Sequence, residues 1–171
     1  SPGAIDDRVY PADPPRPRFA PAKVPGGEGG PAAELLTLLD TWRWRRGKTD
    51  ALLLLGWIGT AMLGGALRWR PMAWVTGDRA TGKSTLHEML AIVMGEGIVS
   101  VADATGAGIW QKLGHASLPV AIDELEADED NRRALAIIKL ARQAASGAVM
   151  LRGGADHKGV EFTARSCFLF S

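Results

Sequence analysis

The sequence predicts an α/β domain in which helices cover both faces of a mostly parallel sheet. Three observations predict it. Short apolar segments of strand length alternate with helical patterns from residue 71 onward, as in chains that build a parallel sheet. One such segment runs into the glycine-rich loop 77–84, and another ends in the carboxylates Asp123 and Glu124. With 171 residues, 46% of them hydrophobic, the chain can bury one substantial core.

Composition narrows the classes of function. The formal net charge of +1 gives no global sign of nucleic-acid binding, so any such site has to be a local patch. Cys167 is the only cysteine and lies in an apolar run, which excludes a disulfide framework and a thiolate metal site. This usage favours a reducing compartment. Because the chain begins without Met and ends in a strand-like run, we expect it to be part of a longer polypeptide.

The loop 77–84, Gly-Asp-Arg-Ala-Thr-Gly-Lys-Ser, matches the phosphate-binding P-loop pattern G-x-x-x-x-G-K-[ST]. Its glycines allow backbone to approach phosphate oxygens, and its N–H groups and the following helix N-terminus attract the anion. Lys83 would add a full charge at the β/γ-phosphates, and the Ser84 hydroxyl would bind Mg²⁺. The predicted nucleotide-binding residues are Gly77, Asp78, Arg79, Ala80, Thr81, Gly82, Lys83, Ser84 and Thr85. The alternative is a glycine-rich surface turn that happens to contain Lys-Ser.

A second candidate functional motif follows the apolar strand expected at 118–122. There, Asp123 and Glu124 form the Walker B pattern. Asp123 at the strand end would hold Mg²⁺ through its water shell. Glu124 would orient and deprotonate an attacking water as the catalytic base. Further acids at 126 and 128–130 leave another interpretation, a solvated acidic loop that also caps the next helix.

The chain before the P-loop divides in two. Residues 1–31 hold most of the prolines and a glycine-rich run, which predicts a disordered linker. Residues 32–70 predict a helical lead-in, and 71–171 the ATPase core, incomplete at its C-terminal end. The first helix is expected over 32–44. A cluster of basic residues interleaved with tryptophans follows at its end: Trp42, Arg43, Trp44, Arg45, Arg46 and Lys48. Such a cluster could contact nucleic acid, or its cations could simply stabilise a helix C-terminus.

The segment 51–67 carries no charged residue and has to be weighed as a membrane span. As a helix it would reach only about 25 Å, short of the roughly 30 Å hydrocarbon core of a bilayer. We therefore expect a buried helix and no membrane partner, with a membrane-tethered ATPase as an alternative.

The remaining elements are expected as the strand 72–76, the helix 86–94, the strand 98–102, the helices 105–113 and 130–146, a hairpin of 149–152 with 160–163, and the strand 166–170. The hairpin tip offers Arg152, His157 and Lys158 as DNA-binding residues, although an exposed hairpin without a partner has the same composition. Ser171 follows the last strand. It would hold the attacking water or the γ-phosphate as a catalytic residue, or it is a plain strand-end serine.

Two features separate classes of P-loop protein. A strand is expected between the P-loop strand and the Walker B strand, and Glu124 directly follows Asp123. Both resemble the additional-strand, catalytic-glutamate division of P-loop NTPases, which contains AAA+ ATPases and hexameric helicases. This favours an ATP-driven motor or switch over a small-molecule kinase.

Over roughly residues 50–171 the chain resembles the AAA+ helicase domain of phage and prophage primase-helicases, related to superfamily-3 helicases. The motifs that carry the resemblance are GDRATGKST, LPVAIDE and the hairpin RGGADHKGVEF followed by a strand ending at Ser171. The resemblance implies ATP and Mg²⁺ as cofactors, a hexameric ring, single-stranded or fork DNA as partner, an upstream primase-type domain and the cytoplasm of a bacterial host.

Within that resemblance, His157 and Lys158 would grip the DNA backbone inside the ring, and Ser171 falls at sensor 1, where members often have Asn. The arginine finger would lie beyond Ser171, with Arg142 a candidate to act on the neighbouring subunit's ATP. Two alternatives remain: a non-helicase AAA+ switch or loader ATPase, and a nucleotide-binding interaction module.

Overall fold

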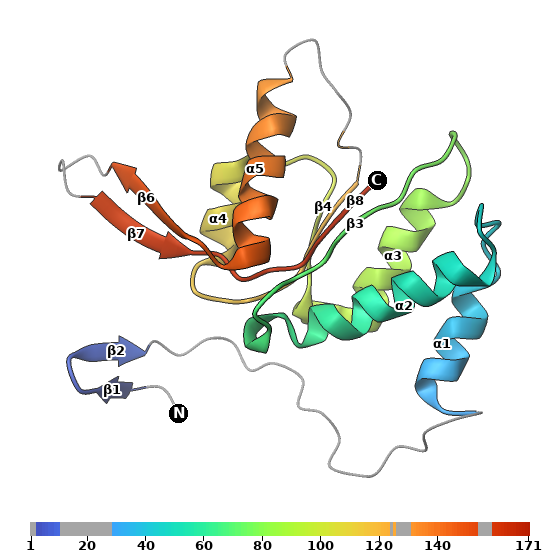
Figure 1. The fold of residues 1–171 in the computed structure, drawn as a ribbon, viewed down its shortest axis with the longest axis horizontal. Coiled ribbons are helices and arrows are strands. Elements are labelled where there is room, and N and C mark those ends of the chain that lie inside the picture. Colours follow the sequence, from blue (N-terminus) through green and yellow to red (C-terminus); the bar gives the residue numbers. More distant parts are fainter. Residues whose placement is uncertain (1–2, 11–28, 124, 126–130, 154–158) are drawn as a thin grey trace.

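The fold is built on a parallel sheet of four strands, ordered β3-β8-β5-β4. A computed structural model describes residues 3–10, 29–123, 125, 131–153 and 159–171. The strands are short: β3 (Met72–Trp74), β4 (Val99–Val101), β5 (Val120–Ile122) and β8 (Phe168–Phe170). All three pairings within this sheet are parallel. The α/β class with a parallel sheet flanked by helices is therefore confirmed (Figure 1).

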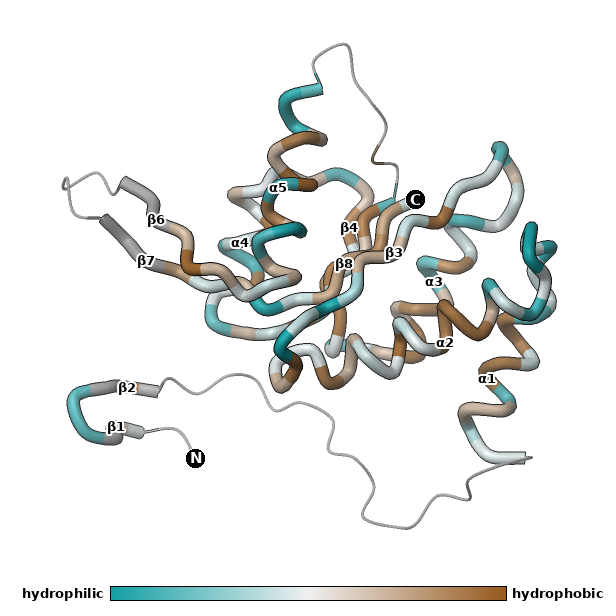
Figure 2. Tube along the Cα trace, in the orientation of Figure 1, coloured by the Kyte–Doolittle hydropathy of each residue, from teal (hydrophilic) through white to brown (hydrophobic). Residues whose placement is uncertain are grey.

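Two layers of helices cover the sheet. The helices are α1 (Pro31–Leu39), α2 (Lys48–Met62), α3 (Lys83–Met94), α4 (Gly106–Leu113) and α5 (Arg132–Ser146). Because alternate residues of a strand point to opposite faces, Phe168 and Phe170 pack with α4 and α5, while Leu169 packs with α1, α2 and α3. Apolar residues accordingly fill the strands and the inward helix faces (Figure 2). The layers explain why β5 and β8 are buried at every position.

Glycines end several helices where the sequence places them. Gly95, Gly114 and Gly147 are the C-caps of α3, α4 and α5, and all three have positive φ. At the other end of α4, the Thr105 hydroxyl accepts a hydrogen bond of 3.0 Å from the Gly108 N–H. Such a cap satisfies a donor that the first helical turn leaves free. Short 3₁₀ turns, η1 (Gly64–Ala66) and η2 (Gly95–Gly97), follow α2 and α3.

The helix expected over 32–44 is shorter, because α1 ends at Leu39. Asp40 is its C-cap, and the Trp44 indole N–H donates to the Leu39 carbonyl at 2.7 Å. An aromatic side chain therefore satisfies a carbonyl at the helix end. The last turn of α1 contains no basic residue, so the interpretation of the basic cluster as cations within the end of this helix is wrong.

The uncharged segment 51–67 lies in α2 and η1, and α2 begins at Lys48. Its buried residues are Ala51, Leu54, Trp57, Ile58 and Ala61. The Trp57 indole N–H reaches across to the Phe168 carbonyl at 3.2 Å, which fixes the helix against the sheet. Within the described ranges, no helix is long and apolar enough to span a membrane.

Two antiparallel hairpins lie outside the main sheet. The first, β1 (Gly3–Ile5) with β2 (Arg8–Tyr10), occupies part of the segment expected to be a disordered linker. Residues 11–28 of that linker lie outside the described residues. The second hairpin, β6 (Val149–Gly153) with β7 (Gly159–Thr163), confirms the pairing expected before the last strand. It projects from the end of the domain near α4 and α5 (Figure 1).

Candidate functional site

The carboxyl edge of the sheet gathers the residues that follow three of its strands. Trp74, Phe170, Ile122 and Val101 lie in one row of the register. The next residue of each strand therefore emerges at the same edge, where open α/β sheets hold their ligands. Backbone hydrogen bonds continue the row one step further, from Ser171 N to Ile122 O at 3.1 Å and from Asp123 N to Val101 O at 3.0 Å.

Asp123 and Ser171 meet at this edge. The Ser171 hydroxyl donates to Asp123 Oδ1 at 2.5 Å, and both side chains are half-buried. The structure thus brings Ser171 beside Asp123, the aspartate of the predicted Walker B pattern, as expected for the ends of neighbouring parallel strands. Glu124 lies outside the described residues.

The loop 77–82 leaves β3 at the same edge and turns into α3. Two of its residues adopt positive φ, Ala80 at 62° and Gly82 at 87°. The Thr81 hydroxyl donates to the Asp78 carbonyl at 2.8 Å and so closes the turn internally. A Cβ on Gly77 would lie 2.8 Å from that Thr81 oxygen. A side chain at position 77 would therefore displace the Thr81 hydroxyl that closes the turn.

Lys83 folds back over the loop that precedes it. Its ammonium donates to the carbonyls of Gly77 at 2.8 Å and Asp78 at 3.1 Å. Helix α3 begins at Lys83, three residues earlier than the expected start at 86. Ser84 and Thr85 consequently lie in the first turn, where backbone N–H groups have no intrahelical partner. Those donors and the helix dipole make this end of α3 suited to an anion.

His87 is a residue of this site that the sequence analysis missed. It is buried on α3, and its Nε2 lies 4.0 Å from Asp123 Oδ1. Neither ring nitrogen has a hydrogen-bond partner among the residues described. Burial lowers the pKa of His87, and the Asp123 carboxylate opposes this only in part. In sequence His87 occupies an inward position of an ordinary amphipathic helix, so only its polarity at a core position marks it.

Ser84 precedes His87 by three residues on α3. Residues three apart on a helix lie on the same face. Because His87 faces Asp123 at 4.0 Å, this spacing directs Ser84 toward the same edge of the sheet, one turn closer to the loop. The hydroxyl and the carboxylate predicted as metal ligands thus come from adjoining elements.

Trp42 also reaches the site, from the lead-in. Its indole N–H donates to the Gly82 carbonyl at 3.1 Å. A Cβ on Gly82 would lie 2.9 Å from the same indole nitrogen, so the second motif glycine is needed for this contact as well as for its φ. Trp42 stacks on Trp44, with ring centroids 6.5 Å apart. In the sequence both tryptophans lie within the basic cluster, and no pattern there predicts a contact with the loop.

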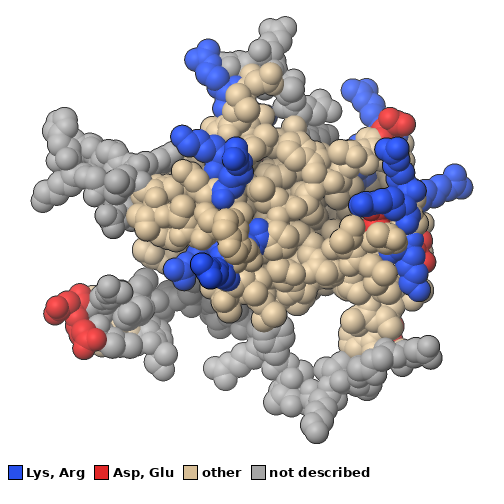
Figure 3. Space-filling model, viewed as in Figure 1, with Lys and Arg blue, Asp and Glu red and all other residues tan. Residues whose placement is uncertain are grey.

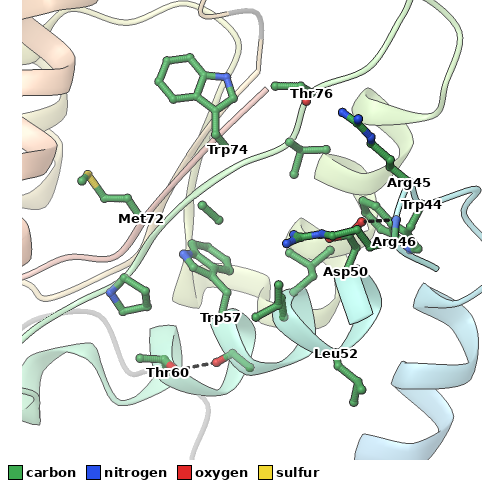
Figure 4. Close-up of a pocket in the computed structure, with 16 residues that line it drawn as sticks. Trp44, Arg45, Arg46, Asp50, Leu52, Trp57, Thr60, Met72, Trp74 and Thr76 are labelled. Carbon is green, nitrogen blue, oxygen red and sulfur yellow. Dashed lines mark hydrogen bonds and ion pairs between the residues drawn. The ribbon is translucent and has the colours of Figure 1, made fainter. Parts of the chain in front are cut away.

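A groove of about 1050 Å³ runs between α2 and β3 beside this contact (Figure 4). Its walls come from α2, from residues 71–76 and from Trp44, Arg45 and Arg46. β3 is an edge strand of the sheet as described, and its Met72 and Trp74 are 46% and 53% exposed. Thr76, which directly precedes Gly77, is among the lining residues, so the groove reaches the start of the loop.

Basic side chains gather over the turns between α1 and α2 (Figure 3). Arg43, Arg45, Arg46 and Lys48 are all exposed. Arg46 pairs with Asp50 on the first turn of α2, which also lowers the pKa of that carboxyl. These cations therefore form a local patch on a chain whose overall charge is near zero.

The hairpin of β6 and β7 is anchored at its base. Met150 is buried, and the Phe162 ring lies 4.5 Å from that of Trp110 on α4. Arg152 pairs through its backbone with Val160 near the far end. His157 and Lys158 lie outside the described residues. Arg142, the candidate for action on a neighbouring subunit, is exposed on α5.

Known structures share this fold. The chain is similar to the A form apo structure of the NrS-1 C-terminal region, with a TM-score of 0.55 and 18% identity over 89% of this chain. A second structure of that region, residues 305–718, matches at a TM-score of 0.50 and 16% identity over 86% of this chain. The chain spans 36% and 32% of those two chains, about a third of their length. At these identities the likeness concerns the fold. No protein-family profile and no curated protein matches the chain.

Proposed function

We propose that this domain binds ATP with Mg²⁺ and hydrolyses it, and that within a ring oligomer it drives movement along DNA. The observation that carries the proposal is the meeting of three elements at one sheet edge. The loop 77–82 leaves β3 there, Asp123 leaves β5, and Ser171 leaves β8 with its hydroxyl 2.5 Å from the Asp123 carboxylate. The motifs of the sequence support the same assignment, and the likeness to the NrS-1 C-terminal region concerns the fold that positions them.

The phosphates would lie on the loop and the first turn of α3. The helix N-terminus offers unpaired N–H donors. In binding a phosphate, Lys83 would exchange one or both of its carbonyl partners, Gly77 and Asp78, for the anion. An ammonium gains more from a charged oxygen than from a neutral carbonyl, so this exchange favours occupancy of the loop.

The donor set suits Mg²⁺. The Asp123 carboxylate and the Ser84 hydroxyl are hard oxygen ligands, and magnesium in phosphate sites takes one or two protein oxygens and keeps several waters. When bound, the ion would neutralise charge that builds up on the β- and γ-phosphates. Ser171 holds Asp123 Oδ1 by a hydrogen bond, which would fix the direction of the carboxylate toward the ion.

Glu124 would orient and deprotonate the attacking water, as a carboxylate at the end of a strand can do once the phosphate is in line. The Ser171 hydroxyl would face the same water or the γ-phosphate. DNA would contact the hairpin through Arg152, His157 and Lys158, with the buried base at Met150 transmitting force to the core.

Calorimetric titration of the chain with ATP and Mg²⁺ tests the binding step. Lys83→Ala should abolish binding because it removes the ammonium that folds over the loop and would bind the phosphates. Lys112→Ala is the matched control, since Lys112 is an exposed lysine on α4, and it should bind as the unaltered chain does. Equal affinity in the Lys83→Ala variant would refute the nucleotide site.

ATPase assays with and without single-stranded DNA test the later steps. They need a longer polypeptide that assembles into a ring. Glu124→Gln should retain ATP while turnover falls by several hundredfold. A His157→Ala/Lys158→Ala double variant should lose stimulation by DNA and keep basal hydrolysis. Turnover that ignores both DNA and the double variant would favour a switch or loader ATPase over a motor.

A further inference from the structure

We propose that Trp42 is a positioning residue for phosphate binding, which orients the peptide between Gly82 and Lys83 through the hydrogen bond from its indole N–H to the Gly82 carbonyl. The inference rests on the proposed nucleotide site and adds a residue of the lead-in to it. Trp42 lies 40 positions before Gly82 in the chain, so it is outside the P-loop pattern and could not be predicted from it.

The Gly82 carbonyl accepts two hydrogen bonds. Leu86 N–H donates at 3.0 Å as the first helical bond of α3, and the Trp42 indole donates at 3.1 Å. A carbonyl oxygen has two lone pairs, so both are used. The two donors come from different elements and together hold the peptide plane against rotation.

Fixing the Gly82 carbonyl also fixes the direction of the N–H of Lys83, because both belong to the same peptide plane. No peptide bond in the described residues is cis, and in a trans peptide the C=O and the N–H of one plane point in opposite directions. The N–H of Lys83 therefore points away from Trp42 and Leu86. It is the first donor of α3, at the position where helix N-termini bind phosphate. Without the indole bond, one helical hydrogen bond alone would hold this plane at a glycine, where backbone rotation meets little steric resistance.

The contact is held rigidly on the side of the lead-in. Trp42 stacks on Trp44, and the Trp44 indole N–H is bound to the carbonyl at the end of α1 at 2.7 Å. The indole edge also packs on the Gly82 Cα, since a Cβ there would meet Nε1 at 2.9 Å and Cδ1 at 3.5 Å. The tryptophan thus contacts the loop through both shape and hydrogen bonding.

Trp42→Phe keeps an aromatic ring and removes the donor. Trp57→Phe is the matched control, because it removes an equivalent indole-to-carbonyl bond, to Phe168 at 3.2 Å, that does not touch the loop. We expect Trp42→Phe to weaken Mg²⁺·ATP binding by about three- to tenfold, the usual effect of one neutral hydrogen bond. Trp57→Phe should bind within about twofold of the unaltered chain. Because Trp57 is buried, its replacement should lower the unfolding temperature at least as much as Trp42→Phe does, so a general loss of stability would not explain the difference.

Tripolyphosphate with Mg²⁺ serves as a second probe, measured by the same titration. If Trp42 acts on the phosphate loop, the fold-loss for tripolyphosphate should equal that for ATP. A loss for ATP alone would overturn the inference, because Trp42 would then contact the nucleoside. Binding of both ligands within twofold of the unaltered chain would overturn it as well, provided that Lys83→Ala abolishes binding. Should Lys83→Ala bind ATP normally, the nucleotide site itself would be wrong.

Discussion

Arg70 should be among the most sensitive positions of the fold, and Arg70→Lys tests why. Arg70 is 5% exposed, and its guanidinium donates to carbonyls on two elements. Nε and Nη2 reach the Gly64 and Leu67 carbonyls at 2.8 and 2.6 Å, around η1. Nη1 reaches the carbonyls of Ala144 and Ala145 at the end of α5, both at 3.1 Å. The side chain therefore ties the lead-in to the C-terminus of α5, where the helix dipole favours a cation.

A lysine at position 70 keeps the positive charge but lacks the planar guanidinium, whose N–H donors point in several directions at once. One ammonium can serve the η1 side or the α5 side, so about two of these hydrogen bonds should disappear. Three of the carbonyls keep a backbone donor, from Leu67 N, Gly147 N and Arg70 N. The loss per bond should therefore stay near the low end for a charged donor, about 1–1.5 kcal/mol. The free energy of unfolding should fall by about 2–3 kcal/mol, which lowers Tm by roughly 5–10 °C in a chain of this size.

Urea unfolding followed by circular dichroism measures this change, with Arg68→Lys as the control. Arg68 lies two residues earlier and is exposed, so its replacement should change the free energy of unfolding by less than about 0.5 kcal/mol. If the free energy of unfolding of Arg70→Lys were less than about 1 kcal/mol below that of Arg68→Lys, the hydrogen bonds of the guanidinium to two elements would not stabilise the fold.

Three more outcomes follow from single residues. Burial raises the pKa of the Cys167 thiol to about 11; because the unfolded thiol ionises near 9 and the folded one does not, stability should fall as pH rises from 9 to 11. At pH 10 the free energy of unfolding should have fallen by about 1.4 kcal/mol more than in Cys167→Ala. Parallel pH profiles of the two proteins would contradict the raised pKa of this thiol. His87→Leu should leave the free energy of unfolding unchanged or raise it by up to about 1 kcal/mol, because it removes a buried imidazole without hydrogen-bond partners among the described residues; a loss of about 2 kcal/mol in urea unfolding would reveal a stabilising contact with Asp123. Gly82→Ala should weaken ATP binding at least about tenfold, since φ is 87° and the new Cβ would lie 2.9 Å from the Trp42 nitrogen; unchanged affinity in calorimetry would show that the loop relaxes freely.

The sequence allowed the sheet to be predicted because its strands read as short apolar runs, and the two central strands, β5 and β8, are buried at every position. It also allowed Asp123 and Ser171 to be placed together, since both follow parallel strands and such strand ends share one edge. The strand boundaries were too wide, as for 72–76 against Met72–Trp74. Local sequence patterns do not show where the hydrogen bonding between neighbouring strands ends.

The contacts of Trp42 and His87 could not be predicted for a different reason. Each is a single side chain at a position that ordinary helix patterns accept, and its partner lies far away in the chain, at Gly82 and Asp123. The pattern of 32–44 even suggested one continuous helix through Trp42. The chain instead leaves the helix after Leu39, which is what allows Trp42 to reach the loop.

This route of the chain bears on where the functional unit begins. The sequence places a boundary at 70/71, between a helical lead-in and an ATPase core. One apolar cluster crosses it, with Leu39 and Trp57 from the lead-in packed beside Leu86, Leu90 and Leu169. Removing residues 32–70 would expose that face of the sheet and of α3. It would also remove the indole that holds the Gly82 carbonyl. The lead-in is therefore a layer of the same core, and the loop's geometry depends on it.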